Sequence, residues 1–223
     1  MTWALNPSVP PIQKNIMPKQ KLQIFIIHGG NTHRSHTNFL RYLRTRKIDI
    51  QKKAGWSGPY LDKKLGRKFH IIRPRMPLQD NAKYKEWALH FERHIPYLHN
   101  NLILIGASLG GIFLAKYLSE NKFPKKILST FLVCPPFDDT LPSEHLTGGF
   151  KLKSDLSLLQ INTKNLRLLF SKNDDVVPVS HAKKYAAKLP HAHIVVYKNI
   201  NEHFRIQKFP EIIRMIKRDY NNL

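Results

Sequence analysis

The sequence predicts an α/β fold: a mostly parallel sheet with helices on both faces. Short apolar runs, rich in β-branched and aromatic residues, alternate along the chain with stretches in which apolar residues recur at helical spacing. Such an alternation is typical of βαβ units, which place helices on both faces of a parallel sheet. The chain has 223 residues, 42% of them apolar, which is enough for the core of one domain.

Six of the apolar runs are predicted strands: residues 22–27, 69–72, 101–105, 127–134, 166–170 and 193–197. The first run, LQIFII, stops at His28, Gly29 and Gly30, and the second is closed by Pro74 and Pro77. Glycine and proline are common at such strand ends because they favour turns over continued strand pairing.

Helices are predicted over residues 37–46, 60–65, 109–119 and 180–189, the last with Ser180 as its cap. A further helix is expected to begin at Asp80 or Asn81, either of which is a good N-cap, and to end near Ile95, before Pro96. The final helix begins near Pro210, a favourable first-turn residue. It is expected to bury Ile212, Ile213 and Ile216.

Two segments fall outside this alternation. Residues 1–20 mix Pro, Asn, Gln and Lys with a few apolar residues, and are predicted to be a tail before a single domain of residues 21–223. Residues 135–165 interrupt the rhythm of strands and helices. Their length fits a small cap over an active site, or equally a surface loop with one helix.

The chain is strongly basic. It has 37 Lys and Arg against 15 Asp and Glu, a formal net charge of +22. Such a field attracts anionic substrates, nucleic acid or anionic membrane surfaces. However, the basic residues are spread along the chain rather than concentrated in one tract. A solvated basic surface with weak polyanion association is therefore the simpler interpretation.

No apolar run approaches the roughly 18–20 residues that a membrane span needs, and the start of the chain lacks the apolar stretch of a secretory signal. Cys134 is the only cysteine, so no internal disulfide can form. We therefore expect a cytoplasmic protein without a transmembrane segment, in which Cys134 is an inert buried residue at the end of a strand. A catalytic thiol is the alternative, but the surrounding sequence matches no thiol-activating motif.

The strand predicted at residues 101–105 leads directly into GASLG at residues 106–110, and a helical pattern follows. This is the G-x-S-x-G motif in the strand–turn–helix context that it requires. A nucleophile on so sharp a turn needs neighbours with little or no side chain, which the two glycines and the alanine supply. Ser108 Oγ is then presented at the carboxyl edge of the sheet, where open α/β folds bind ligands. In a chance match, Ser108 would do no more than cap the helix.

A serine nucleophile needs a base, and the base needs an acid that orients it. The predicted strand at residues 166–170 leads into SKNDDVVP, and the strand at residues 193–197 leads into KNINEHF. Asp174 and His203 therefore follow the ends of two late strands, and with Ser108 they stand in the chain order that a triad on this kind of sheet requires. The alternative is a pair of polar loops whose side chains face solvent.

With the elbow at Ser108, the Asp-x-Val-Val-Pro segment and the late His-Phe pair, the chain resembles the α/β-hydrolase superfamily. More narrowly, it resembles small serine hydrolases related to the animal retinoblastoma-binding hydrolase and its bacterial relatives. The sequences HGG from His28 and RMP from Arg75, followed by Trp87, also suit that group. The resemblance covers roughly residues 21–220 and implies an α/β-hydrolase fold with a small or minimal cap.

The resemblance implies a role for each residue that matches the motif. Ser108 would be the nucleophile, His203 the general base and then acid, and Asp174 the residue that orients the histidine. The oxyanion donors that it implies are the backbone N–H of Leu109 and one from Gly30 or Asn31. It implies no cofactor and no metal.

Two departures from the family pattern concern acidic residues. Relatives usually carry glycine before the histidine, whereas this chain has Glu202, a carboxylate that could raise the pKa of His203 or compete as its partner. Asp175 lies next to Asp174, and the sequence alone does not exclude it. Asp174 is preferred because it lies four residues before Pro178, as in the motif that it resembles.

The sequence thus predicts a serine hydrolase that cleaves an ester, thioester or amide of a small molecule through an acyl-enzyme. One alternative is an interaction protein on a hydrolase scaffold, and another is a charge-driven binder of nucleic acid or anionic surfaces. The complete triad order favours the enzyme, and the lack of an aromatic–basic recognition motif weakens the binder. The remaining histidines, including His191 and His193, lack a third well-spaced ligand and are expected in loops or at the surface. His28 is the exception, because it lies where the oxyanion loop begins and is expected to help shape that loop.

Overall fold

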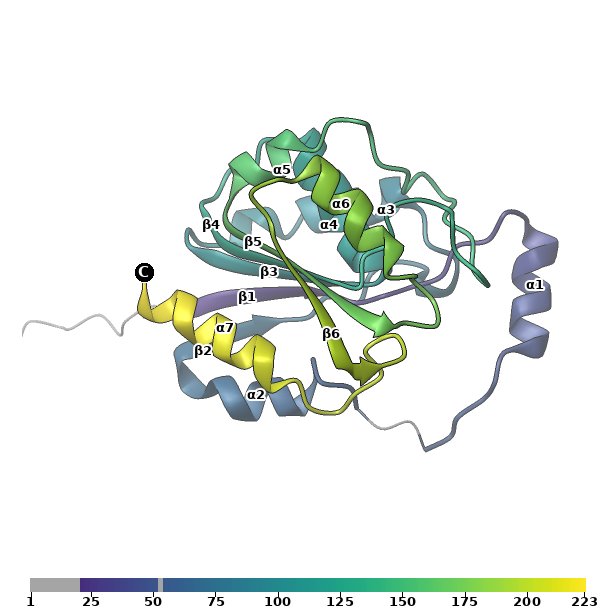
Figure 1. Ribbon diagram of the computed structural model, residues 1–223, viewed down its shortest axis with the longest axis horizontal. Coiled ribbons are helices and arrows are strands. Elements are labelled where there is room, and N and C mark those ends of the chain that lie inside the picture. The colour runs from purple at the N-terminus through teal and green to yellow at the C-terminus, as the bar shows by residue number, and fades with distance from the viewer. Residues whose placement is uncertain (1–20, 52–53) are drawn as a thin grey trace, which may run out of the picture.

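Figure 1 shows the computed structural model, which describes residues 21–51 and 54–223; the predicted tail, residues 1–20, lies outside them. The described chain forms a six-stranded sheet of order β2-β1-β3-β4-β5-β6, in which each neighbouring pair is parallel. The strands are β1 (Leu22–Ile27), β2 (Phe69–Ile72), β3 (Leu102–Ala107), β4 (Ile127–Val133), β5 (Thr163–Asn173) and β6 (His193–Asn201). The predicted α/β fold with a parallel sheet is confirmed.

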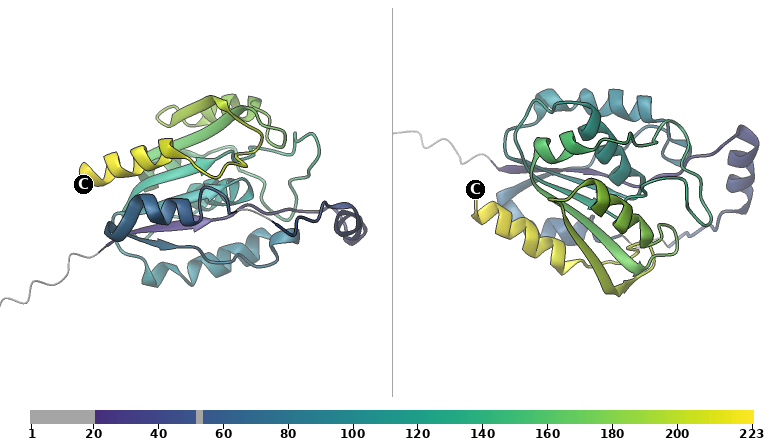
Figure 2. Two further views of the ribbon diagram at one scale, coloured as in Figure 1. Left: turned by 90° about the horizontal axis from the view of Figure 1, so that it is seen from below. Right: turned by 45° about the horizontal axis from the view of Figure 1, so that its top comes forward.

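Helices cover both faces of the sheet (Figures 1 and 2). One face carries α3 (Tyr84–Glu92), α4 (Leu109–Glu120), α5 (Ser157–Asn162) and α6 (Ser180–Lys188), and the other α2 (Pro59–Leu65) and α7 (Pro210–Asn221). Each face has its own apolar core. Trp87 and Phe91 of α3 are completely buried on the first face, and Ile212 and Ile216 of α7 on the second. The burial predicted for α7 is confirmed.

The strand order places a ligand site beside β1. From β1 the chain moves outward to β2, and then returns to form β3 on the other side of β1. Ligands of open α/β sheets bind beyond the carboxyl ends of the strands at such a reversal. Ile27 pairs with Gly106, so the loops that follow β1 and β3 begin side by side at that edge.

Two predicted helix caps are wrong. The helix expected from Asp80 or Asn81 begins at Tyr84, and both of those residues lie in a 3₁₀ turn. The backbone N–H of Tyr84 donates to Gly148 O at 2.8 Å, so a loop distant in sequence satisfies this helix start instead of a local side chain. Ser180 is the first residue of α6 rather than its cap.

Segments outside the layers gather at the carboxyl edge of the sheet. α1 (His36–Thr45) buries none of its residues and stands apart from the sheet in Figure 1. Residues 134–156 form a long loop before α5. The backbone N–H of Thr147 donates to Thr32 Oγ1 at 2.9 Å, which ties this loop to the segment after β1. None of the helices in the described residues is long and apolar enough to cross a membrane.

A buried ion pair fixes α7 to the sheet. Arg167 of β5 donates from both terminal nitrogens to the carboxylate of Asp219, with Nη2 2.7 Å from Oδ1. The two side chains are only 7% and 4% exposed. Ser129 Oγ donates to the same carboxylate at 2.6 Å. The charges are thus paired and hydrogen-bonded, as buried charges need to be.

Candidate active site

Ser108 lies on the turn between β3 and α4. Its φ of 53° and ψ of −121° lie outside the regions that residues other than glycine usually occupy. Its backbone N–H donates to Val133 O at 2.8 Å, which holds the turn against β4. Such strain persists only where the surrounding structure imposes it, and it is common at functional sites. The strained strand-to-helix elbow predicted from the GASLG motif therefore lies at Ser108.

The elbow has no room for side chains at Gly106 and Gly110. A Cβ on Gly106 would lie 2.3 Å from Gly110 O, and a Cβ on Gly110 would lie 2.4 Å from Ile27 O. Because the contacted atoms belong to the backbone of packed elements, a small side-chain movement cannot relieve either clash. The glycines of the motif are therefore required by the close approach of α4 to β1 and β3.

Asp174 follows β5 and is held by three groups at once. Its Oδ1 accepts the backbone N–H of Val176 at 2.9 Å and that of Val177 at 2.8 Å. Both carboxylate oxygens lie 2.9 Å from Nδ1 of His203. The side chain is only 1% exposed. A buried carboxylate in this setting both orients the imidazole and stabilises a positive charge on it.

His203 sits on a tight turn after β6. Glu202 and Phe204, on either side, have φ values of 57° and 49°. The backbone N–H of Glu202 donates to Asn173 O at 3.2 Å, and the buried Phe204 ring packs 5.3 Å from that of Phe209. Two left-handed residues other than glycine, separated by a single residue, are uncommon outside constrained turns. The turn thus directs the imidazole, 13% exposed, towards Asp174.

The two other acids that the sequence left open bind Arg205 instead. Asp175 Oδ2 lies 2.6 Å from Arg205 Nη1, and Glu202 Oε2 lies 3.4 Å from the same nitrogen. Their side chains are 48% and 60% exposed. Asp174, not Asp175, contacts the histidine.

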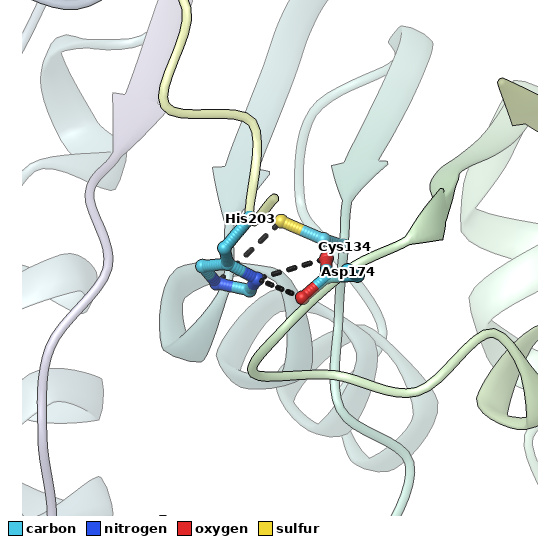
Figure 3. A group of neighbouring side chains, drawn as sticks. All are labelled: Cys134, Asp174 and His203. Atoms are coloured by element: carbon cyan, nitrogen blue, oxygen red, sulfur yellow. Dashed lines mark hydrogen bonds and ion pairs between the residues drawn. The ribbon is translucent and has the colours of Figure 1, made fainter. Parts of the chain in front are cut away.

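Cys134, at the end of β4, contacts His203 as well: its Sγ lies 3.6 Å from Nε2 (Figure 3). Ala107 pairs with Val133, so Ser108 and Cys134 are the next residues on adjacent strands. Within the described residues, Sγ is the hydrogen-bond partner of Nε2, and Ser108 Oγ is not hydrogen-bonded to it. Cys134 is buried, as expected, but it belongs to this site. β3 and β4 are consecutive strands that pair in the sheet, so the residues that follow them, Ser108 and Cys134, come to lie at the same edge. The sequence analysis did not use this signal.

These contacts determine the charge of His203. Burial lowers the pKa of its imidazole, while the sulfur of Cys134 and the carboxylate of Asp174 raise it, with a net rise to about 10. The two contacts therefore stabilise the positive charge that His203 carries once it has accepted a proton. Within the described chain, the same three residues also make up the group that could hold a metal ion, since their ligand atoms lie within 4.8 Å of one another.

The expected oxyanion donors lie on the opposite side of the elbow. Leu109 is the first residue of α4, where backbone N–H groups have no partner within the helix. A Cβ on Gly30 would lie 2.7 Å from Gln79 O and 3.2 Å from Leu109 Cδ2, so the loop after β1 packs closely on the elbow. The backbone N–H of Asn31 donates to Gln79 O at 2.9 Å and is thus already used. Of the two expected residues in this loop, Gly30 fits the role better.

His28 fixes the loop that carries Gly30. Its Nε2 accepts the backbone N–H of Met76 at 2.9 Å, which leaves Nδ1 to donate to Gly29 O at 2.6 Å. Its ring packs edge-on against Trp87, with centroids 5.8 Å apart. These three contacts give His28 a structural part in shaping the loop.

A cavity of about 380 Å³ lies between the segment after β1, α1 and the long loop. Asn31, Arg41, Tyr42 and Glu144 are among the residues that line it. Asn31 Nδ2 donates to the hydroxyl of Tyr42 at 3.0 Å. Burial raises the pKa of Glu144, and the charge of His203 opposes this rise, so the two side chains are within electrostatic reach of each other. Glu144 thus links the lining of the cavity electrostatically to the histidine.

Comparisons with known proteins show the family and the fold of the chain. A family model described as serine hydrolase matches residues 52–218. The ydeN gene product from B. subtilis superposes with a TM-score of 0.71 at 20% identity, over 90% of this chain and 100% of that one. A ydeN-like hydrolase from Pectobacterium atrosepticum gives 0.61 at 16% identity, over 91% and 92%. These structures show the fold that the chain shares. No curated protein matches it by sequence.

Proposed function

The chain belongs to the serine hydrolase family, and from this premise we propose that it cleaves an ester, thioester or amide through an acyl-enzyme on Ser108. His203 is the general base and then the general acid, and Asp174 orients it. All three residues lie within the matched segment, residues 52–218. No cofactor or metal takes part in these steps.

The observation that carries this proposal is the pair formed by Asp174 and His203. Both carboxylate oxygens are 2.9 Å from Nδ1, and the carboxylate is 1% exposed. A hydrogen bond at Nδ1 selects the tautomer in which Nε2 can accept a proton. The pair stands at the edge of the sheet from which the strained elbow of Ser108 projects, and a nucleophile needs its base there.

The reaction follows the geometry of the elbow. Ser108 Oγ attacks the substrate carbonyl while its proton passes to His203 Nε2. The tetrahedral oxyanion accepts the backbone N–H groups of Leu109 and Gly30. When the intermediate collapses, Nε2 returns the proton to the leaving oxygen, sulfur or nitrogen. Water then attacks the acyl-enzyme with the same histidine as base, and the acid product and free Ser108 are released.

This mechanism requires Nε2 to exchange its partner from Cys134 Sγ to Ser108 Oγ. Base–nucleophile hydrogen bonds are often long or poorly aligned in enzymes without substrate, and tighten only in the substrate complex. Ser108 and Cys134 follow paired positions of β3 and β4, so both residues lie at the same part of the sheet edge. We propose that this exchange of hydrogen-bond partner occurs when substrate binds.

The cavity at Glu144 suggests which substrates fit. Its volume of about 380 Å³ is near the lower end of the range for small-molecule pockets. The lining residues that face it include His33, Arg41 and His145. Because Arg41 offers hydrogen-bond donors and a positive charge while Glu144 offers a carboxylate, we propose a small substrate with polar groups near the scissile carbonyl.

Hydrolysis of short-chain p-nitrophenyl esters tests the proposed function. We expect the parent protein to gain the mass of the acyl group in a rapid quench, and Ser108→Ala to gain none. The rate should fall by roughly 10⁴–10⁶-fold in this variant. Ser154→Ala, which changes an exposed serine of the long loop, is the matched control and should keep the parental rate. Equal rates in Ser108→Ala and the parent would exclude Ser108 as the nucleophile.

A further inference from the structure

We propose that Cys134, His203 and Asp174 form a site for a soft divalent cation such as Zn²⁺, which binds Cys134 Sγ and His203 Nε2 directly and thereby inhibits the enzyme. The binding is independent of the hydrolase mechanism; only its inhibitory effect rests on the proposed function. The site lies at the sheet edge, where Figure 3 shows the three side chains converging from the segments that follow β4, β5 and β6.

The spacing of the two direct ligands suits a tetrahedral ion. With Zn–S of about 2.3 Å and Zn–N of 2.0–2.1 Å, a tetrahedral angle puts sulfur and nitrogen about 3.6 Å apart. Cys134 Sγ and His203 Nε2 are 3.6 Å apart without any movement of the chain. Thiolate and imidazole are also the ligand types that favour Zn²⁺ over Mg²⁺ or Ca²⁺.

Asp174 completes the arrangement through the other nitrogen of the imidazole. Metal-binding histidines usually donate their second ring N–H to a carboxylate, which fixes the tautomer and makes the ligand more basic. Asp174 accepts the N–H of His203 Nδ1 at 2.9 Å, and its carboxylate is held in turn by the backbone N–H groups of Val176 and Val177. The same contact that prepares His203 as a base thus prepares it as a metal ligand, and solvent supplies the remaining coordination.

The local charge favours a cation although the whole chain carries +22. Asp174 binds His203 directly, and Glu144 interacts electrostatically with His203, Asp174 and Asp175. The facing cation, Arg205, is already paired with Asp175 at 2.6 Å. Cys134 is 2% exposed and Asp174 1%, and the imidazole of His203, at 13%, is the most exposed of the three groups.

Binding has a direct chemical consequence. The thiol and the imidazole release the protons that they carry to solvent, and each donates a lone pair to the ion. Nε2 then has no lone pair with which to accept the proton of Ser108, so acyl transfer stops until a chelator removes the ion.

Cobalt absorption spectroscopy tests the site directly. Co²⁺ replaces Zn²⁺ in such sites and shows a sulfur-to-cobalt charge-transfer band only when a thiolate is bound. Because Cys134 is the only cysteine of the chain, such a band in the full-length protein has to come from this residue. We expect the band in the parent and in Ser108→Ala, its loss in Cys134→Ser, and its displacement by Zn²⁺. Asp174→Asn should weaken metal affinity by about 10- to 100-fold, as loss of an outer carboxylate usually does.

The outcomes separate this inference from the proposed function. No charge-transfer band in the parent, or an unchanged band in Cys134→Ser, overturns the metal site whatever the protein hydrolyses. A band that is equal in parent and His203→Asn overturns the participation of the histidine. A band with no effect of Zn²⁺ on ester hydrolysis overturns the inhibition. If Ser108→Ala keeps both the band and full hydrolysis, the site stands and the proposed function fails.

Discussion

Asp174 and His203 lie at the ends of two neighbouring strands, and both carboxylate oxygens of the first face Nδ1 of the second at 2.9 Å. Asp175, next in the chain, points instead to Arg205 at 2.6 Å. Of these two consecutive aspartates, one is therefore a buried acid that orients the histidine and the other belongs to an exposed ion pair.

Substitution of the two aspartates tests this difference. Asp174→Asn should lower kcat for ester hydrolysis by roughly 10⁴-fold, because the amide cannot stabilise the imidazolium or hold the required tautomer. Asp175→Asn, the matched control, should stay near the parental rate, since the pair that it breaks is exposed. Steady-state kinetics measure both. A loss at Asp175 as large as that at Asp174 would contradict the assignment.

The loop after β1 should be sensitive to one methyl group. Gly30→Ala places a Cβ 2.7 Å from Gln79 O and 3.2 Å from Leu109 Cδ2, so the loop has to move away from the elbow. We expect kcat to fall by up to roughly 10²–10³-fold, which is the usual effect of losing one oxyanion donor. Gly55→Ala, whose Cβ would lie 3.9 Å from the nearest atom, is the control and should keep full activity. Similar kinetics in both variants would show that Gly30 is not part of the oxyanion site.

The buried ion pair should dominate the attachment of α7. Asp219→Ala leaves the guanidinium of Arg167 buried without a counter-charge, which costs about 3–5 kcal/mol in comparable cases. Asp62→Ala breaks the exposed pair with Arg73 and should cost no more than about 1 kcal/mol. Urea unfolding gives both free energies. Equal losses of unfolding free energy in the two variants would show that the pair of Arg167 and Asp219 contributes no more than an exposed ion pair.

His181 should make stability depend on pH. Burial lowers the pKa of this imidazole in the folded protein, and its Nδ1 accepts the backbone N–H of Phe137 at 2.8 Å. The groups that face it are Thr140, Lys184 and Asp138. Because the unfolded chain binds the proton more tightly, stability is lost as the pH falls through the ordinary histidine pKa of about 6.5.

A variant isolates this contribution. His181→Asn keeps an acceptor near Nδ1 but cannot titrate, so its free energy of unfolding should fall less between pH 7 and pH 5 than that of the parent. Urea unfolding at the two pH values measures the difference. Parallel losses in both proteins would mean that His181 does not carry the effect.

The sequence predicted those parts of the fold and site that depend on local pattern. The strand before Ser108, the glycines around it and the helix after it are contiguous, and the structure shows that this strained turn requires them. The six strands follow from apolar runs for the same reason, although β5 and β6 extend beyond the predicted ends.

What the sequence did not predict depends on contacts between distant segments. The start of α3 is set by a hydrogen bond from Tyr84 to Gly148, which no local cap signal encodes. Cys134 was expected to be inert because its neighbours in sequence match no motif, yet strand order brings it to His203. Glu202 was a candidate partner of the histidine, but its carboxylate binds Arg205, a residue outside the motif.

The central claim is that Ser108 is the acyl-accepting nucleophile, and covalent labelling of the unmodified protein tests it most directly. A fluorophosphonate probe reacts with a serine only where a working base and oxyanion site activate it. Mass mapping of the labelled protein should place the phosphonate on Ser108, and prior denaturation should abolish the label. A label on any other residue, or none on the folded, metal-free protein, would contradict the account.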